Sequence, residues 1–230
     1  MKKTVLFLGV LLLVFTSLYG DEVSKKYIKY LQSLPTKTKK YRFFKLVKPA
    51  VDKVYDKYEK LYLQVKNDIE NNTTNKRQIA LLMKKYNATD KIDLLKRLKP
   101  NPKSITLAQA AIESAWGTSR FFVEANNIFG IWSKNESHDR IKANKLHKSG
   151  KQVYLRKFKS LEDSINEYFR ILAILPAYKE YRDVRYRTDD VYDILMYLNN
   201  YSEKKELYPM ELAKIIYHNN LIKYDKKNNN

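Results

Sequence analysis

Residues 107–132 hold most of the features that constrain how this chain can fold. Residues 107–117 read LAQAAIESAWG, and residues 126–132 read NNIFGIW. Both tryptophans of the chain lie in this window, as do two of the three glycines that follow residue 20. In a chain so poor in glycine, each one indicates a place where backbone geometry requires it. The window therefore predicts a functional site with a defined backbone geometry rather than an ordinary surface helix.

Glu113 is the one acidic residue between positions 107 and 117, and its neighbours are mostly small or apolar. The pattern predicts a largely buried helix that begins after Pro102, is capped by Ser104 and ends at a left-handed Gly117. Apolar burial and the negative end of a helix both favour the protonated carboxylic acid. This is the form that a general acid needs to protonate a glycosidic oxygen. The alternative is a surface glutamate, or one satisfied by a buried partner such as Arg120.

The rest of the chain predicts a mainly α protein (α+β) with one small β element beside the site. Residues 22–99 show helical periodicity with a break at 71–75, and Pro100 and Pro102 mark a boundary because neither fits a helix interior. Residues 152–158 alternate as a strand does, which predicts a short β-hairpin. Further helices are predicted at 161–175, 189–199 and 209–217, and the tail at 226–230 is predicted to be disordered.

The first 20 residues have the pattern of a secretory signal peptide. Lys2 and Lys3 precede an apolar run at residues 5–15, which is shorter than the roughly 20 residues that span a bilayer. We therefore expect secretion across the inner membrane, to the periplasm or the extracellular medium. The alternative is an uncleaved N-terminal anchor, and in either case the domain lies outside the cytoplasm.

The formal charge of the chain is +20, and it contains no cysteine. Residues 1–20 hold two lysines and no acid, so the remainder carries +18. Such a charge favours polyanionic partners, which outside a cell are anionic cell-wall polymers or a membrane surface rather than nucleic acid. The alternative is a Lys-, Asn-, Tyr- and Ile-rich bias of the coding genome, which would spread charge over every solvated face.

The segments AQAAIESAWGTSRF and NNIFGIW resemble the glucosaminidase domain of glycoside hydrolase family 73, and more narrowly the Bax-like group of secreted bacterial proteins. Softer matches at residues 34–49, 175–182 and 201–208 extend the resemblance over nearly all of the chain after residue 20. The resemblance implies a lysozyme-like fold that cuts the glycan strand of peptidoglycan at N-acetylglucosamine. We accordingly divide the chain into an N-terminal helical extension at 21–102 and a glucosaminidase domain at 103–225.

The same resemblance implies that Glu113 is the catalytic acid and that Tyr201 lines the cleft, where it positions the acetamido group or water. Tyr208, a few residues further on, is expected to be structural. Without the resemblance, Tyr201 would be read more simply as one packed tyrosine among 19.

A second carboxylate is harder to place. Retaining hydrolysis needs one about 5–5.5 Å from the acid, and inverting hydrolysis one about 6.5–9.5 Å away. Some relatives supply it from the β element, where the candidates here are Glu136 and Asp139. Each is alternatively a solvated loop residue. A substrate-assisted route through the acetamido oxygen needs neither of them.

Aromatic and amide side chains near Glu113 are candidates for substrate binding. Trp116, Phe129 and Trp132 suit stacking against sugar rings, and Trp116 is expected on nearly the same helical face as Glu113. Each is alternatively a core residue. Asn127 suits hydrogen bonds to substrate amides or, alternatively, caps the turn before Phe129. We expect no cofactor and no metal, because the three histidines lack metal-ligand spacing and no nucleotide motif is present.

The sequence thus predicts a peptidoglycan hydrolase, an endo-β-N-acetylglucosaminidase, that acts on glycan strands through Glu113. The main alternative is a non-catalytic cell-wall-binding or morphogenesis protein on the same fold. An amidase acting on the peptide stem is a further alternative, which no zinc-ligand set supports. A nucleic-acid-binding module rests on charge alone and is opposed by the signal peptide. The oligomeric state is not indicated.

Overall fold

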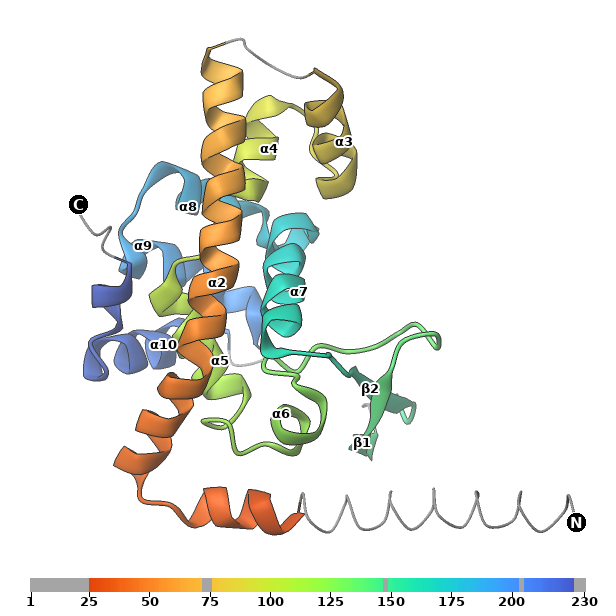
Figure 1. Cartoon of the computed structure of the whole chain (residues 1–230), viewed down its shortest axis with the longest axis vertical. Coiled ribbons are helices and arrows are strands. Elements are labelled where there is room, and N and C mark those ends of the chain that lie inside the picture. The colour runs from red at the N-terminus through yellow and green to blue at the C-terminus, as the bar shows by residue number, and fades with distance from the viewer. Residues whose placement is uncertain (1–24, 72–75, 147–148, 203–204, 226–230) are drawn as a thin grey trace, which may run out of the picture.

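A computed structural model describes residues 25–71, 76–146, 149–202 and 205–225. The predicted signal peptide and the C-terminal tail lie outside these residues. Residues 25–33 are helical and lead into α2 (Thr36–Glu70), a helix of 35 residues that extends along the molecule (Figure 1). The helix bends in its N-terminal third, and Pro49 lies inside it without a backbone N–H to donate.

Helix α2 forms because apolar residues recur at spacings of three and four along it. Val47, Val51, Val54 and Tyr58 are buried on one face, while lysines occupy much of the other. The buried face packs against α4, α5 and α7. The described part of the predicted N-terminal extension therefore shares one hydrophobic core with the rest of the chain.

Two short helices follow the break that was predicted at residues 71–75. They are α3 (Lys76–Tyr86) and α4 (Lys91–Leu98). Asp90 caps α4 by accepting a hydrogen bond from the backbone N–H of Asp93 at 2.8 Å. Pro100 and Pro102 then separate α4 from α5, as the sequence predicts.

Helix α5 (Lys103–Glu113) lies at the centre of the fold. Residues 104–111 are all buried, and the helix contacts α2, α9 and α10. The predicted cap is wrong, because Ser104 lies inside the helix. Its backbone N–H donates to Oδ1 of Asp225 at 3.0 Å, so a residue from the far end of the chain caps α5.

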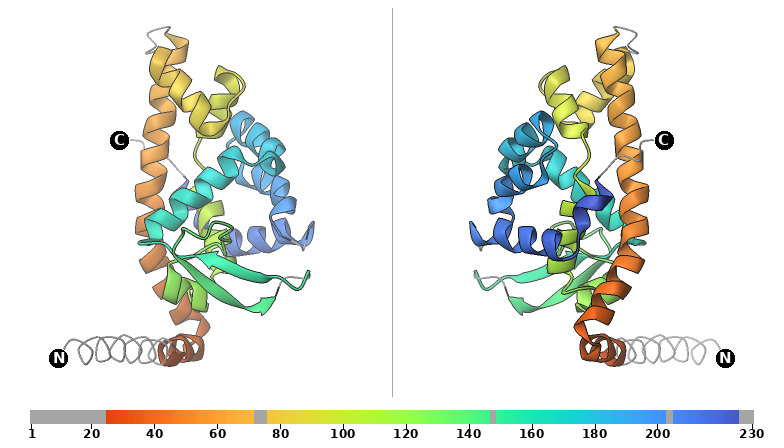
Figure 2. Two further views of the ribbon diagram at one scale, coloured as in Figure 1. Left: turned by 90° about the vertical axis from the view of Figure 1, so that its right-hand side faces the viewer. Right: turned by 90° about the vertical axis from the view of Figure 1, so that its left-hand side faces the viewer.

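The β element is an antiparallel hairpin, which confirms the predicted ribbon. Strand β1 (Arg140–Leu146) pairs with β2 (Gln152–Arg156), with Ile141 opposite Leu155. A short helix, α6 (Arg120–Ala125), comes before it. In both views of Figure 2 the hairpin extends to the same side of the molecule as α10.

The C-terminal half completes the helical layer around α5. Its elements in chain order are α7 (Leu161–Ile174), η1 (Pro176–Tyr178), α8 (Lys179–Arg187), α9 (Val191–Leu195), η2 (Met196–Tyr201), α10 (Leu207–His218) and η3 (Leu221–Tyr224). Helix α8 was not predicted, because it is short and strongly polar. The predicted fold class, mainly α with a small β-hairpin, is confirmed.

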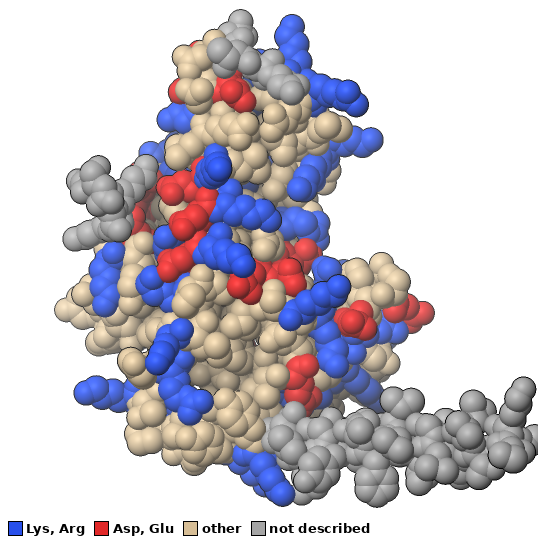
Figure 3. Space-filling model, in the orientation of Figure 1, with Lys and Arg blue, Asp and Glu red and all other residues tan. Residues whose placement is uncertain are grey.

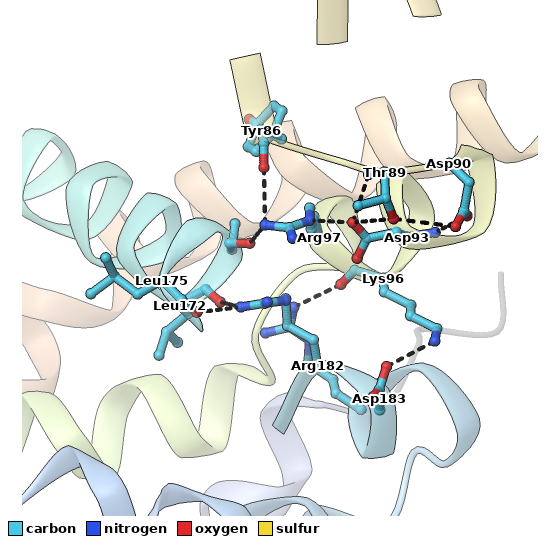
Figure 4. Close-up of polar contacts among 12 residues, drawn as sticks. Tyr86, Thr89, Asp90, Asp93, Lys96, Arg97, Leu172, Leu175, Arg182 and Asp183 are labelled. Atoms are coloured by element: carbon cyan, nitrogen blue, oxygen red, sulfur yellow. Dashed lines mark hydrogen bonds and ion pairs between the residues drawn. The ribbon is translucent and has the colours of Figure 1, made fainter. Parts of the chain in front are cut away.

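Two arginines hold the C-terminal end of α7 (Figure 4). Arg182 on α8 donates to the carbonyl oxygens of Leu172 and Leu175, each at 2.9 Å. Arg97 on α4 donates to the carbonyl oxygen of Ala173 at 2.9 Å and is paired with Asp93 at 2.8 Å. Orphan carbonyls at a helix end need such donors, so this cluster fixes how α4, α7 and α8 meet. Among the described residues, no helix is both long and apolar enough to cross a membrane.

Candidate active site

The site begins where α5 ends, in an unusual turn. Ala115, Trp116 and Gly117 all have positive φ, at 50°, 59° and 74°. The buried Ser114 organises this turn, since its hydroxyl donates to the carbonyl oxygen of Ala110 and accepts from the N–H of Gly117. Left-handed geometry is unfavourable for Ala and Trp, so the backbone here stores strain next to Glu113.

Gly117 adopts the left-handed conformation that the sequence predicts. A Cβ at this position would lie 3.3 Å from the rings of Phe43 and Phe122. Glycine is therefore required for both its φ angle and its close packing.

Trp116 points toward α2 and not along the helical face of Glu113. Its ring makes edge contacts with Phe43 and Phe44, each at a centroid distance of 5.7 Å, and the Lys40 ammonium lies 5.0 Å from its ring centroid. The expectation of a shared face is wrong because α5 ends at Glu113 and the next turn is left-handed. Trp116 instead lines a groove of about 870 Å³ whose lining does not include Glu113.

Glu113 is the last residue of α5 and is partly exposed. The hydroxyl of Tyr208 on α10 donates to its Oε1 at 2.7 Å. Tyr208, expected from the sequence to be structural, thus contacts the proposed catalytic acid directly. In the described part of the chain, it is Tyr208 rather than Tyr201 whose hydroxyl is hydrogen-bonded to this carboxylate.

Three tyrosines surround the carboxylate and respond to its charge. Burial, together with the charge of Glu113, raises the pKa of Tyr178 to about 12. Burial and the charge of Glu113 also raise the pKa of Tyr208 far above its ordinary range. Burial, together with the neighbouring Tyr208 and Glu113, raises the pKa of Tyr201 in the same way. The ring of Tyr201 stacks on that of Tyr208 at 5.5 Å and 8°. These phenols stay protonated at neutral pH, so they can act as hydrogen-bond donors.

Behind Tyr208 lies a buried polar cluster. Gln109 on α5 donates through Nε2 to the Tyr208 hydroxyl at 3.1 Å, and the hydroxyl of Tyr168 on α7 donates to Oε1 of Gln109. All three side chains are at most 1% exposed. Gln109 and Tyr168 were not predicted as site residues, although Gln109 stands one helical turn before Glu113 and that spacing was a usable signal.

Two predicted substrate-binding residues are used structurally. Phe129 is buried and stacks on Tyr168 at 4.0 Å and 10°. Asn127 is also buried and caps its own turn, which was the alternative reading. Its Nδ2 donates to the carbonyl oxygens of Ile131 and Arg156, and its Oδ1 accepts from the N–H of Ile131. Both residues support the wall beside the site and do not offer free groups to a substrate.

The remaining candidates lie on the surface near the hairpin. Trp132 is 53% exposed and forms an isolated bridge with Leu155 of β2. Glu136 and Asp139 are exposed in the segment that leads into β1, where Glu136 pairs with Arg140 at 3.0 Å. Among the described residues, no group of three or more His, Cys, Asp or Glu side chains is placed to hold a metal ion.

The chain is similar to known proteins in both sequence and fold. A family model described as mannosyl-glycoprotein endo-β-N-acetylglucosaminidase matches residues 88–221, which is more than half of the chain. Protein bax of Escherichia coli (strain K12) is 33% identical over 92 residues, which are 40% of this chain and 31% of that protein. The match thus spans about a third of the length of this relative.

A solved structure shares the fold. The catalytic domain of the autolysin Auto from Listeria monocytogenes superposes with a TM-score of 0.52 at 21% identity, covering 89% of this chain and 97% of that one. The resemblance of residues 107–132 to a lysozyme-like glucosaminidase domain is confirmed by these matches. The chain belongs to the glucosaminidase family.

Proposed function

We propose that this protein is a peptidoglycan hydrolase, an endo-β-N-acetylglucosaminidase that cuts the glycan strand with Glu113 as the general acid. The observation that carries the proposal is the setting of Glu113. One carboxylate stands at the end of a helix whose residues 104–111 are all buried, accepts a hydrogen bond from the Tyr208 hydroxyl at 2.7 Å and remains partly exposed. Family membership supports the reaction class, and the structural relative is called an autolysin.

The proposed reaction starts with proton transfer. Protonated Glu113 gives its proton to the glycosidic oxygen while the bond from that oxygen to the anomeric carbon breaks. Positive charge develops on the sugar ring, and the carboxylate left on Glu113 stabilises it. Tyr201 would orient the acetamido group or a water, and its stacking on Tyr208 beside the carboxylate supports this role.

The group that completes the reaction is also a proposal. Glu136 or Asp139 would supply the second carboxylate from the segment before β1. Both side chains are exposed, so either would have to meet the substrate across the site. Glu136→Gln and Asp139→Asn, assayed separately, distinguish the two. If both variants keep their activity, the acetamido oxygen of the substrate becomes the better candidate.

Product analysis tests the proposed bond specificity. Purified peptidoglycan is digested, the new reducing ends are reduced chemically, and the fragments are identified by mass spectrometry. We expect reducing ends on N-acetylglucosamine. New ends on N-acetylmuramic acid, or release of the peptide stems, would contradict the proposal. Binding to peptidoglycan without any product would favour the non-catalytic wall-binding alternative.

We also propose that residues 1–20 direct secretion, because they combine a basic start with a short apolar run. Fractionation of cells that produce the full chain should place it outside the cytoplasm. A chain that starts at residue 21 should stay inside the cell. Equal distribution of the two would contradict the proposed leader.

A further inference from the structure

A continuous chain of hydrogen bonds runs through the core and ends at Glu113. It starts at Tyr181 on α8, whose hydroxyl donates to Oδ1 of Asn101. From there it passes through Tyr168 and Gln109 to Tyr208. The five side chains come from four helices and the segment between α4 and α5, and each is at most 1% exposed. Polar groups this deeply buried are costly unless all of them are satisfied, so such a chain calls for a reason.

The direction of the chain is set at Thr106. The Thr106 hydroxyl donates its single proton to the carbonyl oxygen of Pro102 at 2.9 Å. It must therefore accept from Asn101, whose Nδ2 lies 2.9 Å away. This fixes the Asn101 amide with Nδ2 toward Thr106 and Tyr168, and with Oδ1 toward Tyr181.

Each further step follows from the number of protons that each group holds. Nδ2 of Asn101 donates to the Tyr168 hydroxyl at 3.0 Å, so the proton of Tyr168 is free to point to Gln109. That proton requires an acceptor, which fixes Oε1 of Gln109 toward Tyr168 and Nε2 toward Tyr208. The Tyr208 hydroxyl accepts from Gln109, and its own proton goes to Oε1 of Glu113. Every donor in the chain thus points toward the carboxylate.

We infer that Asn101, Tyr168 and Gln109 are positioning residues that hold the Tyr208 hydroxyl as a donor to Oε1 of Glu113 and so place the transferable proton of Glu113 on Oε2. Oε1 already accepts a proton from Tyr208, so the acidic proton of Glu113 resides on the other oxygen. The inference rests on the proposed function, because it matters only if Glu113 is the acid. Burial raises the pKa of Tyr168 far above its ordinary range, which keeps that hydroxyl a donor.

The pH dependence of turnover tests this inference with Tyr168→Phe. The variant removes the proton that orients Gln109, so Gln109 can turn its Oε1 toward Tyr208 and draw that hydroxyl away from Glu113. A hydrogen bond donated to a carboxylate favours its charged form, and its loss makes Glu113 hold its proton to higher pH. The basic limb of the kcat profile should move up by about half a pH unit or more, as expected for one hydrogen bond.

The matched control is Tyr58→Phe, which loses the hydroxyl of another buried tyrosine. Tyr58 on α2 donates to the carbonyl oxygen of Asn166 and takes no part in the chain of hydrogen bonds that ends at Glu113. This variant should leave the basic limb in place. The carboxyl carbon of Glu113, followed by 13C NMR in the resting enzyme and assigned by its absence in Glu113→Gln, should titrate higher in Tyr168→Phe and as in the wild type in Tyr58→Phe.

A second variant covers a loss of folding in Tyr168→Phe. Gln109→Met introduces no charge and removes the Nε2 donor that holds the Tyr208 hydroxyl, so it should weaken the hydrogen bond to Glu113 and move the same limb upward. If Tyr168→Phe and Gln109→Met shift the limb and the NMR titration no more than Tyr58→Phe does, the hydrogen-bond chain is only structural and the inference is overturned. If Glu113→Gln itself keeps wild-type turnover, the proposed function fails instead, so the two failures are distinguishable.

Discussion

At the scale of single residues, the phenol hydroxyls beside Glu113 give a direct prediction. Tyr208→Phe removes the donor to Oε1 but keeps the ring that stacks on Tyr201. We expect turnover on peptidoglycan to fall at least tenfold, because a misplaced acid loses the orientation that makes proton transfer fast. The unfolding free energy should fall by about 1–3 kcal/mol, because the hydroxyl also accepts from Gln109, whose buried donor is left without a partner.

Tyr201→Phe separates the role expected for Tyr201 from that of its neighbour. If the Tyr201 hydroxyl orients the substrate, this variant should also lose turnover, and it should leave the basic limb of the pH profile unchanged because Tyr208 still holds Glu113. Steady-state kinetics over a range of pH measure both effects. Wild-type turnover in Tyr201→Phe would show that its phenol only packs.

At the scale of elements, the contacts of Arg97 and Arg182 with the C-terminal end of α7, which we call the clamp, predict that losing Arg182 causes a large change in stability. Arg182 is 2% exposed, and although burial lowers its pKa to about 10 the guanidinium stays charged at neutral pH. Arg182→Met leaves the carbonyls of Leu172 and Leu175 without this donor (Figure 4). The unfolding free energy should fall by at least about 2 kcal/mol.

Arg187→Met is the control for the clamp. Arg187 lies in the last turn of the same helix, α8, and its guanidinium donates in an exposed position to the carbonyl oxygen of Asp183. Urea unfolding of this variant should stay within about 0.5 kcal/mol of the wild type, as for most surface substitutions. Equal losses in the two variants would mean that the clamp does not hold α7.

The cap of α5 predicts a pH dependence of stability. Burial raises the pKa of Asp225 above its ordinary value of 3.8, against the hydrogen bonds from Ser104 and the charge of Lys103, which lower it. In the pH range between 3.8 and this raised pKa, the folded chain binds more protons than the unfolded chain does. Stability from this residue is therefore complete below the range and is lost as the pH rises through it.

Asp225→Asn keeps an acceptor for the N–H of Ser104 but has no charge to bury. The melting temperature of the wild type should fall relative to that of Asp225→Asn as the pH rises from about 3.8 toward neutrality. Thermal unfolding at a series of pH values measures the difference. A wild type that instead gains stability over the variant with rising pH would contradict the assignment.

Local sequence patterns predict some features of this structure and not others. Periodicity and breakers gave the C-terminal end of α2 and the position of β2, because those signals are local. The cap of α5 by Asp225 and the contact of Tyr208 with Glu113 join residues far apart in the chain, and no local pattern encodes them. The direction of Trp116 was predicted wrongly because two non-glycine residues after α5 adopt a left-handed backbone. That geometry is rare enough that residue type alone does not indicate it.

At the scale of the whole molecule, the positive charge is unevenly distributed. Residues 25–51 contain nine Lys or Arg and no acidic residue. In Figure 3 the lower left end of the molecule shows no acidic side chain, while acidic side chains gather mostly in the middle of that face and beside the hairpin. An even genomic bias does not account for this asymmetry, which favours an anionic partner at that end.

Binding to intact sacculi should weaken steeply with salt, since the Debye length falls from ~10 Å at 0.1 M to ~3 Å at 1 M. Replacing the exposed Lys37 and Lys45 by Glu should weaken sedimentation with sacculi more than the same change at Lys84 and Lys85 on α3. Equal effects of the two pairs would mean that total charge alone acts. Salt-independent binding would mean that stacking and hydrogen bonds dominate.

The assignment of Glu113 as the acid is tested most directly by turnover on purified peptidoglycan in two matched variants. Glu113→Gln keeps the shape of the side chain but has no proton to transfer, whereas Glu124→Gln changes a partly buried glutamate that pairs with Arg120 on α6. Glu113→Gln should lose at least about 100-fold in kcat, the lower range of general acid catalysis, and Glu124→Gln should stay near the wild type. Wild-type turnover in Glu113→Gln, or an equal loss in both variants, would contradict the assignment.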